Sequence, residues 1–309
     1  MKSILVTSNI DPDLDGTASG YAYAEYLTKL GKSNVNVAFL GEFHEETKFV
    51  LKKFKIKHPK RVKEISLFEE VVLVDISEIS AFQGKLNAHK VSEIIDHRIV
   101  NGKEGFPKAN VQIELVGSSA TLITERFMNS ELDISYESGV LLYSAIVSNT
   151  INFKSKVTTK RDKEAAKWLQ KKVKLPAKYW EELFNSKSDL SGKKLLKTIL
   201  HDSVKGFKVN GVNISTIQLE IMDGGRLLKE RKQEIKKILS DLKKEYDLKH
   251  ISMVIIDLRD LKGYILAFDK VTKEMYEKAF KKKFSRNVIT LKKALMRKEI
   301  FPMLKEYIH

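Results

Sequence analysis

Short apolar runs alternate with helix-like segments through the first 117 residues, and this alternation restricts the fold more than any other feature. The helix-like segments are residues 16–30 and 44–54, and the runs expected to form strands are residues 3–9, 34–41, 70–77, 91–98 and 111–117. Strands that alternate with helices pair in parallel, and the resulting sheet is covered on both faces. The first part of the chain is therefore predicted to be α/β with a parallel sheet.

A second, smaller α/β domain is expected in the remainder of the chain. Residues 118–202 are helical in pattern, and the stretch Asp-Leu-Ser-Gly at 189–192 combines turn formers with a helix cap. We therefore place the domain boundary there, with domains at 1–188 and 193–309. A length of 309 residues suits two domains. The second domain is expected to hold a long helix and three strands, at residues 226–249, 212–220, 250–260 and 262–269.

Polar side chains cluster where three of the predicted strands end. They are Asn9, Asp11, Asp13 and Asp15 after the first strand, Asp75 after the third, and Asp96, His97 and Arg98 after the fourth, while Asn149 ends an apolar helix. Ligands of parallel α/β sheets bind beyond the carboxyl ends of the strands. We therefore expect these side chains to lie together.

Clustered carboxylates repel one another unless a cation offsets their charge. Hard oxygen ligands with one imidazole suit Mg²⁺ or Mn²⁺, and two such ions can share a carboxylate and activate a water. A single aspartate after a strand is more often a turn former or a helix cap, and Asp13 alone can cap the helix at 16. The coincidence of three strand ends favours the metal site.

The net charge of +16 is consistent with an anionic ligand, but it also fits a lysine-rich solvated surface such as helix 226–249. The absence of cysteine excludes disulfides, thiolate metal sites and cysteine nucleophiles. No apolar run is long enough to span a bilayer, and the first residues lack the apolar core of a signal peptide. We therefore expect a cytoplasmic protein without a membrane partner.

Several motifs together resemble the DHH phosphoesterase superfamily, in the branch that holds the family II (manganese-dependent) inorganic pyrophosphatases, exopolyphosphatases and prune proteins. The first domain carries NIDPDLDG, LVDISE, IIDHRIV and VGSSATLITE, and the second carries DSVKGF and MRKEIFPML. The resemblance covers nearly the whole chain. It implies a DHH domain followed by a smaller phosphate-binding α/β domain, with the active site in the cleft between them.

Carried over residue by residue, the resemblance implies a set of metal ligands that departs from the usual pattern. The set is Asn9, Asp13, Asp15, Asp75, His97 and Asn149, with Asp75 as the bridge between ions. Asn9 stands where the family has a histidine, Asn149 where it has an aspartate, and Arg98 where a second histidine contacts phosphate. Amide ligands make the site less negative, which weakens Mn²⁺ binding and favours Mg²⁺ or leaves one position poorly filled. Asp11 adds a carboxylate nearby that compensates in part.

The leading hypothesis is a phosphoanhydride hydrolase that acts on pyrophosphate or short polyphosphate with Mg²⁺, Mn²⁺ or Co²⁺, as one or two ions. Its expected catalytic residues are Asp13, Asp75, His97 and Arg98, and its expected substrate-binding residues are Arg98, Lys205, Arg297 and Lys298. The sequence leaves the oligomeric state open, and a homodimer is one candidate.

Two other functions are retained as alternatives. The first is a catalytically impaired homologue that binds phosphate compounds in a regulatory role, which the asparagines at 9 and 149 favour. The second is an oligonucleotide or cyclic nucleotide phosphodiesterase. Relatives of that kind carry Gly-Gly-Gly-His, whereas the nearest glycine pair here, in MDGGRLL, is not followed by a histidine. Nucleic acid is therefore not an expected partner.

Overall fold

The computed structural model describes residues 2–98, 105–188, 190, 194–200 and 206–308. The chain forms two compact units, Met1–Leu183 and Phe184–His309. The boundary predicted at 189–192 lies outside the described residues except for Leu190, which is buried in the core of the second unit.

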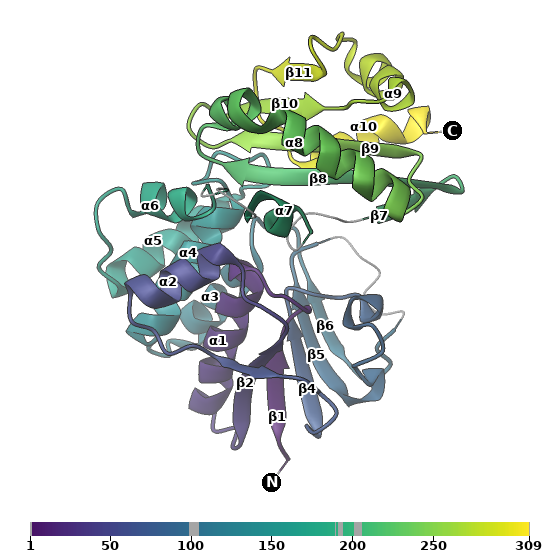
Figure 1. Ribbon diagram of the computed structural model, residues 1–309. Coiled ribbons are helices and arrows are strands. Elements are labelled where there is room, and N and C mark those ends of the chain that lie inside the picture. The colour runs from purple at the N-terminus through teal and green to yellow at the C-terminus, as the bar shows by residue number, and fades with distance from the viewer. Residues whose placement is uncertain (1, 99–104, 189, 191–193, 201–205, 309) are drawn as a thin grey trace. The chain divides into compact units, whose positions relative to one another are not determined.

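The first unit is built on an all-parallel six-stranded sheet with the order β3-β2-β1-β4-β5-β6, which confirms the predicted architecture (Figure 1). The strands are β1 (Ile4–Thr7), β2 (Val35–Leu40), β3 (Lys60–Val62), β4 (Glu70–Val74), β5 (Val91–Asp96) and β6 (Asn110–Ile113). The sequence pattern did not indicate β3, which is three residues long and lies at the sheet edge.

Helices cover one face of this sheet. They are α1 (Leu14–Lys29), α2 (Glu45–Lys53), α3 (Ser119–Ser130), α4 (Tyr136–Asn149) and α5 (Lys160–Lys172), followed by α6 (Tyr179–Ser186) at the unit boundary. Helix α1 packs against α3 and α4. Its Gly20 lies so close to the sheet that an added Cβ would be 2.7 Å from Phe39 and 3.7 Å from Val74.

The other face of the sheet is covered by loop segments and short 3₁₀ turns (Ile79–Phe82 and Ala88–Lys90). Side chains alternate between the two faces along each strand, so Leu73 points to the face opposite that of its neighbour Val74. Leu5 and Leu73 share one apolar core on this second face with Phe82, Leu86 and Phe106. The prediction that both faces of the sheet are covered is thus confirmed, although loops rather than helices cover the second face.

The second unit holds a mixed five-stranded sheet with the order β11-β10-β9-β8-β7, in which only β8 and β9 pair in parallel. Its strands are β7 (Gly206–Val209), β8 (Val212–Ile221), β9 (His250–Asp257), β10 (Lys262–Leu266) and β11 (Val288–Leu291). Its helices are α7 (Lys194–Thr198), α8 (Gly224–Glu245), α9 (Lys270–Phe280) and α10 (Arg297–Leu304). The four-residue strands β7 and β11 were not expected.

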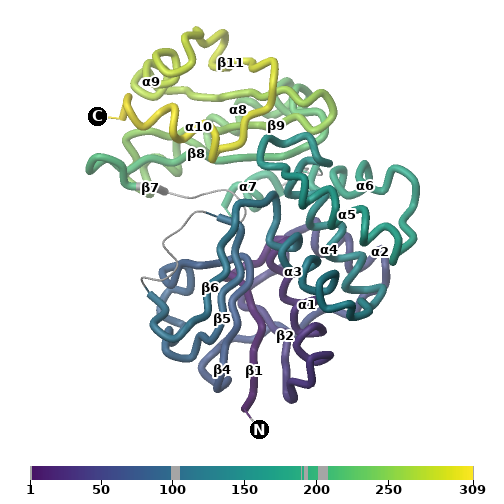
Figure 2. The backbone as a smooth tube through the Cα atoms, turned by 180° about the vertical axis from the view of Figure 1, so that it is seen from behind, coloured from purple at the N-terminus to yellow at the C-terminus, as the bar shows by residue number. Residues whose placement is uncertain are grey.

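The long helix α8 joins β8 to β9 and lies along one face of the second sheet, while α9 and α10 lie on the other (Figures 1 and 2). Its apolar residues recur at helical spacing and join the core of this unit, with Ile235, Leu239 and Leu242 against Met253 and Ile255 of β9. Its lysines therefore lie on the outer side of an ordinary packed helix. No helix in the described part of the chain is long and apolar enough to cross a membrane.

Candidate metal centre

Three buried residues meet beyond the carboxyl ends of β1, β4 and β5, which are neighbours in the first sheet. Asp15 lies in the first turn of α1, Asp75 directly follows β4, and His97 directly follows β5. One ligand atom from each of these residues lies within 4.8 Å of the other two. The sequence analysis expected Asp75 and His97 to lie together because each follows a parallel strand, and in the structure they do.

The ring of His97 is oriented so that Nε2 faces both carboxylates. Nε2 lies 3.5 Å from Oδ1 of Asp75 and 3.8 Å from Oδ2 of Asp15. On its other side, Nδ1 lies 3.0 Å from the carbonyl oxygen of Val116, which only accepts hydrogen bonds. Nδ1 therefore carries a proton, and Nε2 is the ring nitrogen directed toward the two carboxylates, which is the orientation of a metal-binding histidine.

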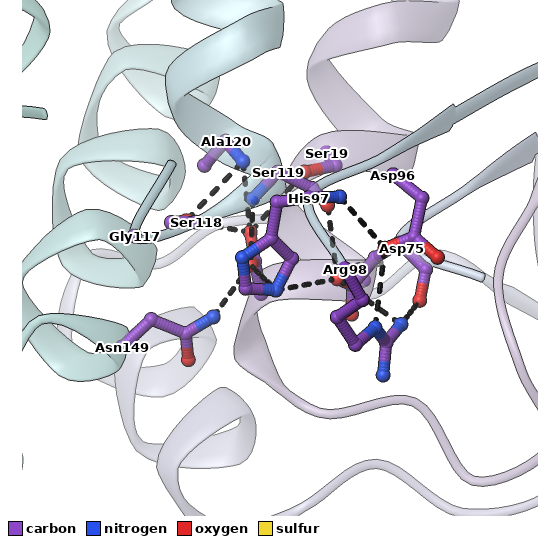
Figure 3. A network of polar contacts seen from close by, with 12 residues as sticks. Ser19, Asp75, Asp96, His97, Arg98, Gly117, Ser118, Ser119, Ala120 and Asn149 are labelled. Carbon is purple, nitrogen blue, oxygen red and sulfur yellow. Dashed lines mark hydrogen bonds and ion pairs between the residues drawn. The ribbon is translucent and has the colours of Figure 1, made fainter. Parts of the chain in front are cut away.

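The N-terminus of α3 surrounds the carboxylate of Asp15. The backbone N–H groups of Ser119 and Ala120 each donate to it at 2.9 Å, and the hydroxyl of Ser118 donates at 2.8 Å. Asn149, at the end of α4, donates from Nδ2 to Oδ2 of Asp15 at 2.5 Å (Figure 3). These donors orient the carboxylate and favour its ionised form.

Burial opposes that ionisation. Burial, reinforced by the charge of Asp13, raises the pKa of Asp15 to about 7 despite the hydrogen bonds from α3. Burial also raises the pKa of Asp75 well above its usual range, and the positive charge of Arg98 only partly offsets this rise. Ionising these two buried carboxylates is therefore unfavourable, and a divalent cation bound between them would offset that cost.

The backbone of Asp75 adopts the left-handed conformation, with φ at +58°. Its N–H donates to the carbonyl of Ile95 at 2.8 Å, and its Oδ1 accepts a hydrogen bond from the Ser119 hydroxyl at 2.9 Å. A non-glycine residue rarely takes this conformation, and it persists only where surrounding contacts hold it. Asp75 is therefore held firmly with its side chain toward His97.

Arg98 lies against two buried carboxylates. Its Nε is 3.1 Å from Oδ1 of Asp96, and its Nη2 is 3.4 Å from Oδ1 of Asp75 and also contacts the Asp75 carbonyl oxygen. Asp96 further accepts from the Ser77 hydroxyl and from the His97 N–H, both at 2.7 Å. The expected contact of Arg98 with phosphate stays a prediction.

The remaining residues expected in the first domain lie around this centre in other roles. Asp13 caps α1, because its Oδ1 accepts from the Gly16 N–H at 2.9 Å, and it is not one of the three residues that meet. The side chain of Asn9 accepts from Ser8 at 3.0 Å and donates to the Ile10 carbonyl at 3.2 Å. Their expected roles as ligands stay predictions.

Asp11 joins two loops. Its Oδ1 accepts from the Glu42 N–H at 2.6 Å, and its N–H donates to the Leu40 carbonyl at 3.1 Å. An added Cβ at Gly41 would lie 2.0 Å from that carboxylate oxygen. The Asp11 carboxylate, expected to compensate at the metal site, thus fastens the loop after β1 to the loop after β2.

The residues expected to bind substrate from the second domain are described only in part. Lys205 lies outside the described residues. Arg297 begins α10 and donates from Nη1 to the Thr216 carbonyl at 3.1 Å and from its N–H to Oε1 of Gln218 at 2.5 Å, which ties α10 to β8. Lys298 is exposed.

Sequence reasoning missed Asp162, a fully buried residue of α5 that stabilises the loop leading to the centre. Its carboxylate accepts from the Gly117 N–H at 3.0 Å to each oxygen, from the Thr121 hydroxyl at 2.6 Å, and from the Thr159 N–H at 2.6 Å. It thereby holds the loop that leads into α3. The available signal was the Thr-x-x-Asp capping box at the start of α5, which indicates a helix start and no long-range contact.

Comparisons with known proteins agree with the motif resemblance. Residues 3–146 match the model of the DHH family, N-terminal domain, and residues 181–307 match that of the DHHA2 domain. The manganese-dependent inorganic pyrophosphatase of Methanothrix thermoacetophila is 31% identical over 98% of this chain and 97% of its own length. A probable manganese-dependent inorganic pyrophosphatase of Bacillus cereus is also 31% identical, over 99% of both chains.

Two solved structures share the fold. A putative family II inorganic pyrophosphatase from Methanococcus jannaschii superposes with a TM-score of 0.78 at 30% identity and covers 98% of both chains. An exopolyphosphatase-related protein from Bacteroides fragilis superposes with a TM-score of 0.53 at 15% identity, covering 99% of this chain and 92% of that one, which shows likeness of fold alone.

Proposed function

We propose a function from the premise that this chain belongs to the family of the manganese-dependent inorganic pyrophosphatases, with a DHH domain and a DHHA2 domain. It is an inorganic pyrophosphatase-like hydrolase of acid anhydrides. Its proposed substrates are inorganic pyrophosphate and short polyphosphate, and its proposed location is the cytoplasm. The observation that carries the proposal is the buried convergence of Asp15, Asp75 and His97.

The donor set fits a divalent cation. Two carboxylates and one imidazole with Nε2 directed toward them suit Mn²⁺ and Mg²⁺, and Co²⁺ is a further candidate. When bound, such an ion supplies an activated water and neutralises charge on the transferred phosphoryl group. Asn9, Asp13 and Asn149 are proposed as further ligands on the strength of the motif match.

The chain's own residues orient and balance this centre. The Val116 carbonyl holds His97 in the required tautomer, and Ser119 holds both acidic residues, Asp15 through its N–H and Asp75 through its hydroxyl. Positioning of this kind keeps the ligands from rearranging when a charged substrate arrives.

We propose that cationic side chains bind the substrate phosphates. Arg98 is the candidate in the first domain, and Lys205, Arg297 and Lys298 are the candidates in the second. Their shared task is to hold anionic oxygens in place, where fixed positive charge stabilises the charge that develops in phosphoryl transfer. The assignment rests on the motif match.

A second candidate function is supported by the contact of Asn149 with Asp15. The Asn149 amide donates to the carboxylate at a position where the motif resemblance implies an aspartate. A chain with such a centre can keep a phosphate-binding role in regulation without turnover. The phosphodiesterase alternative is not proposed, because residues 181–307 match the DHHA2 domain.

The decisive experiment measures phosphate release from pyrophosphate and tripolyphosphate with Mg²⁺, Mn²⁺ or Co²⁺, together with pyrophosphate binding by calorimetry. The hydrolase predicts release with at least one metal, and loss of release in the variant Asp75→Asn. Pyrophosphate binding without release under any metal would replace the hydrolase by the regulatory candidate.

A further inference from the structure

One short segment of the chain, residues 116–120, contacts all three residues of the metal centre. The hydrogen bonds run from the segment's backbone and hydroxyl groups, and they are those of Val116 to His97, Ser118 and Ala120 to Asp15, and Ser119 to both Asp15 and Asp75. The contacts of Ser118, Ser119 and Ala120 are drawn in Figure 3. A shift of this segment would therefore displace all three side chains of the centre together.

The carboxylate of Asp162 holds this segment at two points. The N–H of Gly117, the second residue of the segment, lies 3.0 Å from each carboxylate oxygen. The hydroxyl of Thr121, which directly follows the segment, donates to Oδ1 at 2.6 Å. Asp162 is fully buried, and hydrogen bonds are stronger electrostatically in such surroundings than in water. One buried side chain of α5 thus fixes the place of the segment.

The close approach of Asp162 depends on glycine at position 117. A Cβ added at Gly117 would lie 2.9 Å from Oδ2 of Asp162 and 2.6 Å from Cγ2 of Thr150. A larger residue would push the carboxylate away from the Gly117 N–H. The sequence thus leaves room for this contact at the place where the segment begins.

Helix α5 is also linked to the centre through the chain itself. Helix α4 ends at Asn149, whose amide donates to Asp15. Between α4 and α5, residues 151–153 all adopt the left-handed conformation, with φ at +51°, +49° and +62°. Consecutive non-glycine residues rarely do so, and such a turn persists only where surrounding contacts hold it. The start of α5 is therefore tied to the centre twice, through Asn149 and through the contact of Asp162 with Gly117.

We propose that Asp162 is a positioning residue of the metal centre. Through residues 116–120 it fixes where the three side chains of the centre stand, and it thereby sets the affinity of the chain for its divalent cation. The inference rests on the metal site of the proposed function and extends that site to α5. Because linkage between two sites is reciprocal, a bound cation in turn stabilises the contact of Asp162 with Gly117.

Calorimetric titration with Mn²⁺ tests the proposal in two variants of the start of α5. Asp162→Ala removes the carboxylate and should weaken Mn²⁺ binding by about tenfold or more, the usual effect of losing a group that orients metal ligands. The matched control is Thr159→Ala. It removes the hydroxyl that caps α5 and donates to Asp162 at 2.7 Å, but it leaves the hydrogen bonds from Gly117 and Thr121. Its Mn²⁺ affinity should equal that of the wild type. Equal weakening in both variants, or none in Asp162→Ala, would overturn the proposal.

Hydrogen exchange in the wild type keeps the proposal testable even if Asp162→Ala does not fold. The N–H groups of Gly117 and Thr159 both donate to Asp162, so bound Mg²⁺, which is diamagnetic and suits NMR, should slow their exchange. The reference is the Ser138 N–H, which donates to the Ser135 hydroxyl at 3.2 Å at the start of α4. Its exchange should slow less than that of the other two. Equal slowing at all three amides, or none at Gly117, would overturn the proposal.

The phosphate-release assay keeps this inference distinguishable from the proposed function. Mn²⁺ binding that Asp162→Ala weakens, in a chain that releases no phosphate from any substrate, would reject the hydrolase and support the role of Asp162. Phosphate release by the wild type, with unaltered Mn²⁺ binding in Asp162→Ala, would do the reverse. A wild type that binds none of Mn²⁺, Mg²⁺ and Co²⁺ would overturn both.

Discussion

The side-chain amide of Asn149 donates a hydrogen bond to Oδ2 of Asp15 across 2.5 Å. Through this bond the end of α4 contacts the first turn of α1, and it satisfies a carboxylate that is 1% exposed. The amide therefore stabilises the centre before any cation binds, whereas an aspartate at 149 would depend on the cation.

We expect Asn149→Asp to make stability depend on metal. Without metal, a second carboxylate beside Asp15 should lower the free energy of unfolding by about 1–3 kcal/mol, because a hydrogen bond is replaced by repulsion. Mn²⁺ should raise the melting temperature of this variant more than that of the wild type. Melts in chelator and in Mn²⁺ measure both effects. Asn149→Ala, which removes the amide without adding charge, is the control. Equal metal-induced shifts in wild type and Asn149→Asp would contradict the expectation.

Ser119→Ala should weaken metal binding by roughly 10–100-fold, the usual effect of losing a group that orients a metal ligand. Its hydroxyl donates to Oδ1 of Asp75 at 2.9 Å. The matched variant is Ser144→Ala. It removes an equally buried hydroxyl of α4, which is hydrogen-bonded to the Tyr179 hydroxyl of α6. Both variants should lose about 1 kcal/mol of stability. Only Ser119→Ala should shift the Mn²⁺ titration measured by calorimetry, and a similar shift in both would reject the orienting role.

Particular residues show how far the centre could be predicted from the chain. Asp75 and His97 follow apolar runs, and since parallel strands align their carboxyl ends, their meeting follows from the pattern. For Asp13, a metal ligand and a helix cap look alike in sequence; the structure shows the cap, and the ligand role stays a prediction. The contacts of Asp11 and Asp162 join segments distant in the chain. Local pattern has no information about such pairs.

Fold prediction succeeded where the chain carries a marked apolar pattern. Strands β1, β4 and β5 lie in apolar runs, and the apolar positions of α8 recur at helical spacing. Strands β3, β7 and β11, which have three or four residues each, were not predicted from the sequence. Their pairing is decided by the neighbouring strands in the finished sheet.

Asp162→Ala should destabilise the chain by about 3 kcal/mol, because it leaves the N–H groups of Gly117 and Thr159 and the hydroxyl of Thr121 without their buried acceptor. Urea unfolding measures the loss. The control is Asp133→Ala, whose side chain is 92% exposed and pairs only with Lys172 among the described ion pairs; it should change stability by less than about 0.5 kcal/mol. Equal effects of the two substitutions would exclude the supporting role of Asp162.

A comparison of Gly41→Ala with Gly31→Ala separates the cost of backbone strain from the cost of a steric clash between the new Cβ and Asp11. Both glycines have a positive φ, +78° and +82°, so alanine should cost about 1 kcal/mol at either. At Gly31 nothing lies within 4 Å of the added Cβ, whereas at Gly41 the Asp11 carboxylate lies 2.0 Å away. Gly41→Ala should therefore cost roughly 2 kcal/mol more in urea unfolding, since Asp11 must release the Glu42 N–H. Equal losses would mean that the Asp11 contact contributes little.

His250 should make the stability of the second unit fall at acidic pH. It is 3% exposed at the start of β9, and its Nε2 has no hydrogen-bond partner among the residues that the structure describes. Burial lowers the pKa of His250 below its usual 6.5; Asp269 opposes this shift, while Lys243 and Lys249 reinforce it. The hydroxyl of Thr272 lies 3.4 Å from Nδ1 of His250.

The sign follows from the lowered pKa of His250. The unfolded chain takes up the proton near pH 6.5 while the folded chain still resists it, so the free energy of unfolding falls as the pH drops below that value. His250→Gln should remove this part of the slope between pH 7 and pH 5, measured as the difference from wild type in chelator, where the metal centre contributes equally to both. His89→Gln, at an exposed position, should keep the wild-type slope. A His250→Gln variant with the full wild-type slope would place the acid sensitivity in other groups, because no other change distinguishes the two proteins.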